Sequence, residues 1–153
     1  MNYKRNNDLN YYNKYPDYAN CGSYALRLEG WYDPEDYFYK IKGDIGEWAE
    51  EMMKIYNEYD VANLYAEILI EGMLQEFSNE LRLINNYSEI KPNEELILFS
   101  TFCNGYDYYD FHFKVFRSGK WMEKNGSGEV HECDEDDWGD YISDVWCLAH
   151  KYK

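Results

Sequence analysis

The spacing of the apolar residues changes at Lys91-Pro92-Asn93, and this change constrains the fold more than any other feature of the chain. Before it, apolar side chains recur at the three- and four-residue spacing of one long helical face. After it, they form short runs or alternate with polar residues, as in strands. The helical stripe comprises Val61, Leu64, Tyr65, Ile68, Leu69, Gly72, Met73, Phe77, Leu81 and Ile84.

The second half of the chain predicts an antiparallel sheet. Residues 96–103 form an apolar, partly β-branched run typical of a buried strand, and residues 109–117 alternate so that Phe111, Phe113 and Val115 share one face. Ser118-Gly119 is a turn into a partner strand over residues 120–124. Residues 141–149 fit a strand or a helix equally well. Helices followed by an antiparallel sheet predict an α+β domain.

The first half predicts shorter elements and no domain boundary. Residues 1–19 are polar and rich in Tyr and Asn, and they are expected to form an extended arm. A short helix is expected over residues 21–29, closed by Gly30. Asp44 and Asp60 are expected to cap the two helices that follow. No repeat or linker interrupts the sequence, so residues 1–153 are expected to form a single domain.

The charge of the chain restricts its partners. Thirty acidic and 15 basic residues give a formal charge of -15, which disfavours direct binding to a nucleic-acid backbone and favours a basic protein partner. The alternative is that the charge only keeps an aromatic-rich chain in solution. No apolar run is long enough to span a membrane, no signal peptide is evident, and the four cysteines do not form a secretory pattern. These features predict a cytoplasmic protein with reduced thiols.

Asn20-Cys21 is the stretch that points most directly to chemistry. Asn is a preferred N-cap residue, so Cys21 is expected in the first turn of a helix, where the helix dipole stabilises a thiolate. His112 lies on a predicted strand and is the best-placed base. Glu123, across the Ser118-Gly119 turn, or Asp110 would orient the imidazole. The alternative is structural: Cys21 as a small buried apolar residue and His112 as an ordinary strand residue.

Metal and nucleotide sites have little support. An H-x-C pair and a C-x-x-H pair are the candidate ligands for zinc: His131 with Cys133, and Cys147 with His150. The first pair is unusually close, and acidic residues surround it. No glycine-rich phosphate loop is present. No cofactor or metal is expected.

Two stretches resemble a known family. NCGSYAL and DFHFKVFRSGKWMEKNGSG are similar to the motifs N-C-x-x-Y-A, D-x-H-F/W-Y-R and W-x-H-K-x-G of small phage and bacterial papain-like (NlpC-type) proteins. This resemblance implies a papain-like fold with Cys21 as nucleophile and His112 as base, and Glu123 stands where the family has His. The matching residues are Asn20, Cys21, Tyr24 and Ala25, then Asp110, His112, Phe113 and Arg117, then Gly119, Trp121, Lys124 and Gly126.

Two functions follow as expectations. The first is a phage-type cysteine hydrolase, a peptidase or amidase, acting on a protein substrate. The second is an acidic counter-defence inhibitor resembling anti-CRISPR proteins, which blocks a basic surface of a host defence nuclease without catalysis. For a phage protein, either would act in the host cytoplasm. The candidate contact residues are the loop carboxylates Glu132, Asp134, Glu135, Asp136, Asp137 and Asp140, and the helix carboxylates Glu50, Glu51, Glu67, Glu71 and Glu76.

Overall fold

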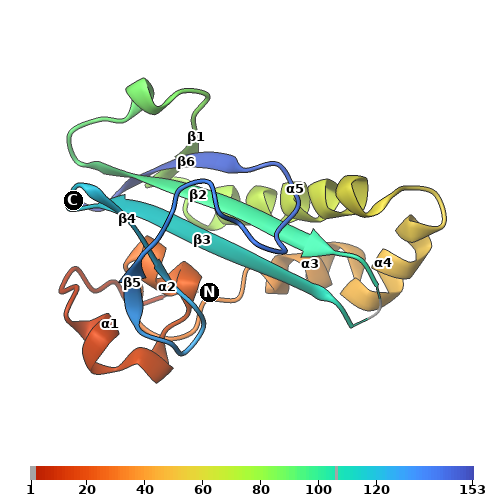
Figure 1. The fold of residues 1–153 in the computed structure, drawn as a ribbon, viewed down its shortest axis with the longest axis horizontal. Helices are drawn as coiled ribbons and strands as arrows, with labels where there is room; N and C mark the ends of the chain where they lie inside the picture. Colours follow the sequence, from red (N-terminus) through yellow and green to blue (C-terminus); the bar gives the residue numbers. More distant parts are fainter. Residues whose placement is uncertain (1–2, 106) are drawn as a thin grey trace.

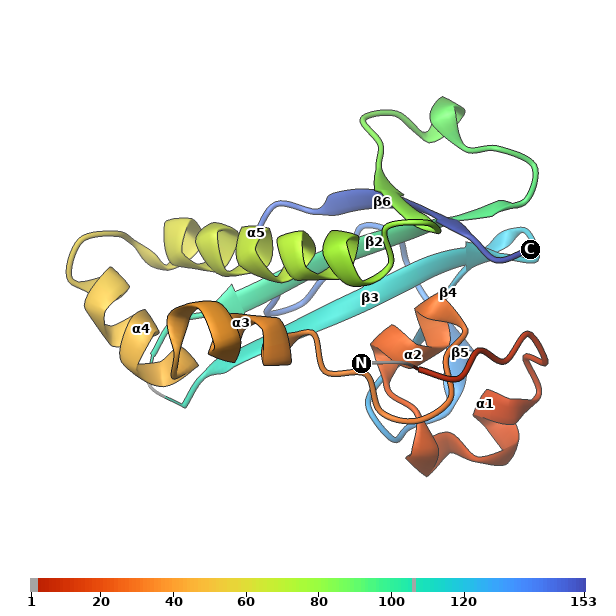
Figure 2. The same ribbon diagram turned by 180° about the vertical axis from the view of Figure 1, so that it is seen from behind.

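The computed structural model describes residues 3–105 and 107–153, and these form an α+β fold. Helices cover one face of a six-stranded antiparallel sheet whose strand order is β1-β6-β2-β3-β4-β5 (Figures 1 and 2). The helices are α1 (Tyr11–Lys14), α2 (Cys21–Leu26), α3 (Glu35–Lys42), α4 (Ile45–Met53) and α5 (Glu58–Glu76). The strands are β1 (Leu81–Leu83), β2 (Glu94–Cys103), β3 (Tyr109–Arg117), β4 (Lys120–Lys124), β5 (Val130–Glu132) and β6 (Trp146–Lys151). Two 3-10 helices, Pro16–Tyr18 and Tyr87–Glu89, complete the described elements.

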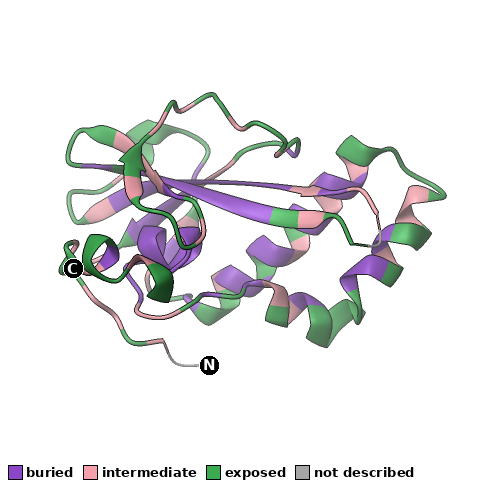
Figure 3. Ribbon diagram, turned by 60° about the horizontal axis from the view of Figure 1, so that its bottom comes forward, coloured by how far each residue is buried: buried purple, intermediate pink, exposed green. Residues whose placement is uncertain are grey.

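The centre of the sheet follows the predicted alternation. β2 pairs with β3 from Leu96–Phe116 to Cys103–Tyr109, and β3 turns into β4 through Ser118 and Gly119, both of which have positive φ. Phe111, Phe113 and Val115 point into the core shared with the helices, as expected. In Figure 3 much of the central strands is purple, the colour of buried residues.

The long helix begins and ends earlier than the sequence predicts. Asn57, not Asp60, caps α5, because its side-chain oxygen accepts the backbone N–H of Asp60 at 2.8 Å. Asp60 therefore lies inside the first turn. The helix ends at Glu76, and Leu81 belongs to β1, which pairs with β6. The expectation for Asp44 is confirmed: its side chain accepts the N–H of Glu47 and caps α4.

The predicted extended arm over residues 1–19 is wrong for the described residues 3–19. α1 and the 3-10 helix Pro16–Tyr18 lie within it, and Tyr12 is fully buried with its hydroxyl bonded to the Leu28 carbonyl. Since burying a tyrosine ring stabilises a fold substantially, this polar-looking segment is part of the structure rather than an appendage. The next helix, α2, ends at Leu26 and is capped by Arg27 in a left-handed conformation (φ 57°), so it stops short of the expected Gly30.

A buried ion cluster fastens α2 to the sheet. Arg27 and Arg117 both make paired hydrogen bonds to Glu95 of β2, at 2.7–3.0 Å. Arg117 also donates to the carbonyls of Tyr24 and Ala25 at the end of α2, where the last helical carbonyls lack a full set of partners within the helix. Burial raises the pKa of Glu95, but the hydrogen bonds from Arg117 and Arg27 outweigh it and hold this pKa at about 2.

The opposite face of the sheet is crossed by the segment between β5 and β6, residues 133–145 (dark blue in Figure 1). The predicted ambiguity at residues 141–149 resolves into this segment and β6. Among residues 3–105 and 107–153, no helix has the length and apolar character that a bilayer span requires.

Candidate active site

The pocket around Cys21 opens where β4 leaves β3. In the described chain β4 pairs with β3 only at Val115–Arg117, so the preceding part of β3 offers an edge that no strand covers. A cavity of about 480 Å³ lies there. Its lining brings Cys21 and His112 together with Asn20, Trp31, Asp33, Glu35, Asp110, Phe111, Asn125, Gly126 and Tyr141.

Cys21 is the first residue of α2, as predicted. The Asn20 side chain accepts the Ser23 N–H at 3.0 Å, and Ser23 in turn bonds back to the N–H of Asn20 to complete a capping box. The Asn20 amide also donates to the Tyr32 carbonyl at 2.6 Å. Asn20 is therefore occupied in holding the start of α2 against the segment that leads to α3.

The expectation of a stabilised thiolate at Cys21 is wrong. Burial raises the pKa of the Cys21 thiol to about 12, and hydrogen bonds from the backbone N–H groups of Phe113, Gly22 and Cys21 lower it too little to compensate. The residue is 6% exposed. Cys21 is consequently a neutral thiol near pH 7, and any reaction at its sulfur requires a base to remove the proton.

The predicted base has the predicted partner. His112 Nε2 lies 2.8 Å from Glu123 Oε1, which places Glu123 in the orienting position. The other oxygen, Glu123 Oε2, lies 2.7 Å from Nε2 of His131, the residue opposite it on β5. The hydrogen bond from His112, together with that from His131, lowers the pKa of Glu123 even though burial opposes this. Beside an ionised Glu123, the neutral tautomer of the His112 ring carries its proton on Nε2, so Nδ1 is the nitrogen that can accept one.

Aromatic rings fix the plane of the His112 ring. Tyr141 stacks on it at a centroid distance of 5.3 Å, and Trp138 meets it edge to face at 6.0 Å. Asp110 does not take the orienting role: its oxygens accept the Phe111 N–H at 2.8 Å and the Tyr141 hydroxyl at 3.1 Å. Asp110 therefore acts on His112 through Tyr141.

Cys21 and His112 reach the pocket from opposite faces of the sheet. The α2 helix packs on the face opposite His112, where a Cβ on Gly22 would approach the Tyr32 and Phe113 rings at 2.8 and 3.1 Å. Only glycine lets α2 come this close. Cys21 and His112 line one pocket because it lies at the edge of β3, where both faces are accessible.

Lys124 holds the two loops beside Cys21. Its side chain is fully buried, and Nζ donates to the carbonyls of Pro16, Ala19 and Gly126. These carbonyls belong to the segment before Cys21 and to the turn after β4. Burial lowers the pKa of Lys124. The Lys124 match to the family motif thus corresponds to a residue that shapes the pocket rather than to a reacting group.

One wall of the pocket is acidic, which the sequence did not reveal. Asp33, Glu35 and Asp110 all line it. Burial, and then repulsion from Asp33, Asp110 and Asp36, raises the pKa of Glu35 to about 7. The only sequence signal was the run Asp33-Pro34-Glu35-Asp36, whose helix α3 went unpredicted because Pro34 offers no side-chain cap.

The candidate ligands for zinc do not assemble. His131 lies on β5 against Glu123, whereas His150 is fully buried in β6, and β2, β3 and β4 separate these strands. Burial lowers the pKa of His150 to about 3. In the described residues no group of three His, Cys, Asp or Glu side chains is arranged to hold a metal ion.

A lysine of β3 holds the acidic loop that follows β5. Lys114, buried in β3, donates to the carbonyls of Asp134 and Asp137 at 2.5 Å, and its Nζ lies 4.3 Å from the Trp138 ring centre. The loop backbone is therefore fixed while its carboxylates face outward. Of the predicted contact residues in this loop, Glu135 is half-buried and bonded to Tyr87, and the other loop carboxylates are exposed: Glu132, Asp134, Asp136, Asp137 and Asp140.

Comparisons of the chain with protein-family models, with curated proteins and with solved structures find no match. The chemistry that the pocket permits follows from its own side chains.

Proposed function

We propose that this chain is a cysteine hydrolase with a papain-like arrangement, in which Cys21 is the nucleophile, His112 the base and Glu123 the orienting carboxylate. The observation that carries the proposal is the shared pocket: Cys21, at a helix start, and His112 line the same cavity, and His112 is hydrogen-bonded to Glu123. A nucleophile, a base and a third group that orients the base are the parts that thiol catalysis requires.

The reaction begins from a protonated Cys21 thiol, because burial raises its pKa. His112 Nδ1 takes the thiol proton as Sγ attacks the carbonyl carbon of an amide, and the resulting imidazolium is stabilised by Glu123. The imidazolium then protonates the leaving amine, which departs as the C–N bond breaks and a thioester forms. Water, deprotonated by His112, attacks the thioester, and release of the acid restores the Cys21 thiol.

Two groups are suited to hold the oxyanion that forms on the way. The backbone N–H of Cys21 starts α2 and has no carbonyl acceptor within the helix, and Asn125, whose side chain carries an amide donor, lines the same pocket. On this proposal Asn125→Ala lowers kcat by about 10²-fold or more.

The acidic wall indicates the charge of the substrate. Asp33, Glu35 and Asp110 favour a cationic group beside the scissile amide, such as a lysine or arginine side chain. Because the pKa of Glu35 is about 7, the wall gains negative charge as the pH rises through neutrality.

The test is hydrolysis of short peptidyl amides that release a fluorescent amine and carry Lys, Ala or Glu beside the scissile bond. Wild type and Cys103→Ala should cleave the Lys substrate best, and Cys21→Ala should not cleave it. Cys103 is the matched control because it too is buried, with a pKa raised to about 12. Cleavage by Cys21→Ala, or no cleavage by wild type, would contradict the proposal.

The fixed acidic loop favours a second candidate function, the counter-defence inhibitor. Lys114 holds the loop backbone, so the carboxylates of Asp134, Asp136 and Asp137 are presented at low entropic cost to a basic partner. Such a protein would block the nucleic-acid-binding surface of a CRISPR nuclease.

An assay of DNA cleavage by such a nuclease distinguishes the two functions. For the inhibitor, Asp134→Lys/Asp136→Lys should abolish inhibition, the effect should weaken with salt, and Cys21→Ala should change nothing. For the hydrolase, Cys21→Ala should lose hydrolysis of the peptidyl amides, and Asp134→Lys/Asp136→Lys should retain it.

A further inference from the structure

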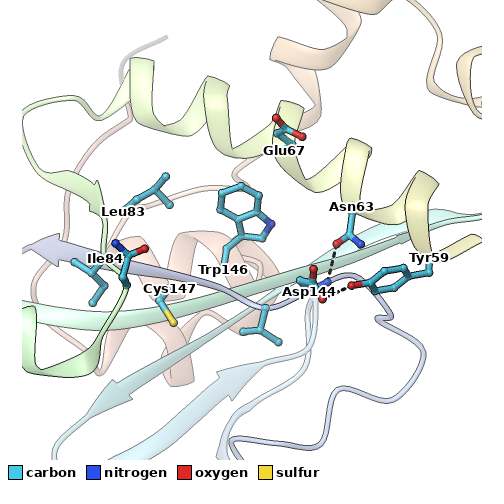
Figure 4. Close-up of a pocket in the computed structure, with 10 residues that line it drawn as sticks. Tyr59, Asn63, Glu67, Leu83, Ile84, Asp144, Trp146 and Cys147 are labelled. Atoms are coloured by element: carbon cyan, nitrogen blue, oxygen red, sulfur yellow. Dashed lines mark hydrogen bonds between the residues drawn. The ribbon is translucent and has the colours of Figure 1, made fainter.

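A second hollow lies along the outward face of α5 and shares no lining residue with the Cys21 pocket. Two cavities, of about 650 and 730 Å³, share Glu67, Leu83 and Trp146 and so form one continuous groove, called here the α5 groove. Figure 4 shows one end of it, where the Trp146 ring stands between Glu67 of α5 and Leu83 of β1. Its further lining residues are Ile41, Lys42, Trp48, Met52, Tyr56, Tyr59, Asn63, Leu64, Ile68, Ile70, Glu71, Leu74, Ile84, Asn85, Asp144, Val145 and Cys147.

The α5 groove exists because α5 is apolar on two sides. Its inner side, with Val61, Tyr65 and Leu69, is fully buried in the core. Its outer side carries Leu64 and Ile68, which remain only half-buried. A helix that met nothing on its outer side would be expected to carry polar residues there.

Neighbouring elements extend this apolar surface. Ile41 is 50% exposed, Leu83 43% and Val145 41%. Contiguous exposed apolar surface of this kind marks an interaction site in a folded protein. Trp146, partly buried at the centre where the two cavities meet, is the type of residue that dominates binding energy.

The rim of the α5 groove is acidic. Glu67 and Glu71 are exposed on adjacent turns of α5, and Asp144 lies at the far end, where it accepts the Tyr59 hydroxyl at 2.6 Å. Lys42 is the one basic residue among those that line the two cavities. Since the whole chain carries -15, an apolar partner with basic flanks is complementary and an acidic one is repelled.

We propose that the α5 groove binds an amphipathic α-helix of a protein partner, with an apolar face flanked by Lys or Arg. From Leu64 to Leu74, α5 rises about 15 Å, which is the length of about three turns of a helix lying along it. Basic residues spaced four apart on that helix match the one-turn separation of Glu67 and Glu71. The apolar face covers Leu64, Ile68 and Trp146 in the helix-in-groove manner. This surface is independent of the chemistry at Cys21.

The probe is a synthetic peptide of about 18 residues made of Leu and Lys, with every Leu on one helical face, measured by calorimetric titration. The same pattern with Glu in place of Lys tests charge, and a scrambled Leu/Lys sequence tests amphipathicity. Wild type should bind the first peptide and neither of the others. Equal binding of the scrambled peptide would mean non-specific attraction to an acidic protein and would overturn the proposal, as would no binding of the first.

Variants locate the site. Trp146→Ala should weaken binding about 30-fold, and Leu83→Lys, a change at an exposed edge position that keeps the fold, should weaken it through both lost contact and repulsion. Glu67→Lys/Glu71→Lys should weaken it about tenfold at low salt. The matched control, Asp134→Lys/Asp136→Lys, makes the same charge change in the acidic loop and should leave affinity within about twofold.

The opposite ranking, with the loop variant losing binding and the groove variants keeping it, would overturn the proposal. A second copy of this chain is the other possible occupant. If light scattering shows a dimer that Leu83→Lys dissociates, the groove is a self-association surface and the proposal fails.

Discussion

The pocket at Cys21 and the α5 groove lie in the same small fold but are built in opposite ways. Around Cys21, polar side chains are buried and tied to one another: His112 to Glu123, Lys124 to three carbonyls, Arg117 to Glu95. In the α5 groove, apolar side chains stand exposed with little to cover them. Buried, mutually fixed polar groups suit chemistry, because catalysis needs preset geometry, whereas exposed apolar surface suits recognition.

The difference teaches that the hollow with the most apolar surface need not be the reactive one. The α5 groove is the larger and more apolar of the two, yet the candidate nucleophile Cys21 and the candidate base His112 line the smaller pocket. Variants in the two regions should therefore change different properties.

Glu123→Gln should have the largest effect, lowering kcat on a cationic peptide by about 10³- to 10⁴-fold. Gln retains a hydrogen bond but loses the charge that stabilises the His112 imidazolium and fixes its tautomer. Steady-state kinetics with a circular dichroism check measures this. His131→Gln, which removes the more exposed partner of the same carboxylate, is the control and should change kcat by less than about tenfold. Similar losses in both variants would contradict the roles assigned here.

Glu95→Gln should lower the free energy of unfolding by about 3–5 kcal/mol, because it leaves Arg27 and Arg117 buried without their counter-charge. Urea denaturation measures it. Its neighbour gives the control: Glu94→Gln disrupts a pair whose Arg82 partner is 37% exposed, and it should cost only about 1 kcal/mol.

The cluster of Glu95 with Arg27 and Arg117 also makes stability depend on pH. The pKa of Glu95 is about 2 in the folded chain against an ordinary value of 4.5, so its contribution is present above pH 4.5 and is lost as the pH falls towards 2. Glu95→Gln should lack this part of the acid denaturation profile. An unchanged profile would mean that the cluster does not hold α2 in place.

Glu35→Gln should remove a pH dependence of stability whose sign is opposite to that of Glu95. The folded chain raises the pKa of Glu35 from 4.5 to about 7, so ionisation is disfavoured in the fold and stability declines as the pH rises between these values. Thermal unfolding at several pH values should show this decline in wild type and a flatter profile in Glu35→Gln. Asp36→Asn, at an exposed neighbour, should retain the decline.

Leu83→Ser should have the smallest effect on stability, within about 0.5 kcal/mol, because this groove residue is largely exposed. Phe113→Ala, in the core beneath Cys21, should cost about 3–5 kcal/mol. If both substitutions were equally destabilising, the α5 groove would be part of the core rather than a binding surface.

The sequence predicted what local geometry determines. The tight Ser118-Gly119 turn fixes the register of β3 and β4, so the approach of Glu123 to His112 was predictable, and Asn20 identified the start of α2. The positions of His131 beside Glu123, and of Tyr141 and Glu35 in the pocket, were missed because they depend on long-range topology. His131 depends on the three-residue strand β5, which is too short to show a pattern, and Tyr141 on a segment that crosses the sheet.

The pKa of Cys21 was mispredicted for a related reason. A helix N-terminus is visible in sequence, but the burial that outweighs its dipole comes from the packing of α2 on β3. The correct end of α2 was hidden as well, since Arg27 adopts a left-handed conformation that its residue type rarely favours.

The most direct test of the Cys21–His112 pair is alkylation by iodoacetamide at pH 7.5, followed by mass spectrometry at each cysteine. Cys21 and Cys103 are both buried thiols with pKa values of about 12, so burial alone would make them equally inert. If His112 acts as a base on Cys21, Cys21 should react much faster than Cys103, and His112→Asn should bring its rate down to that of Cys103. Equal rates in wild type, or a Cys21 rate that His112→Asn leaves unchanged, would contradict a catalytic thiol.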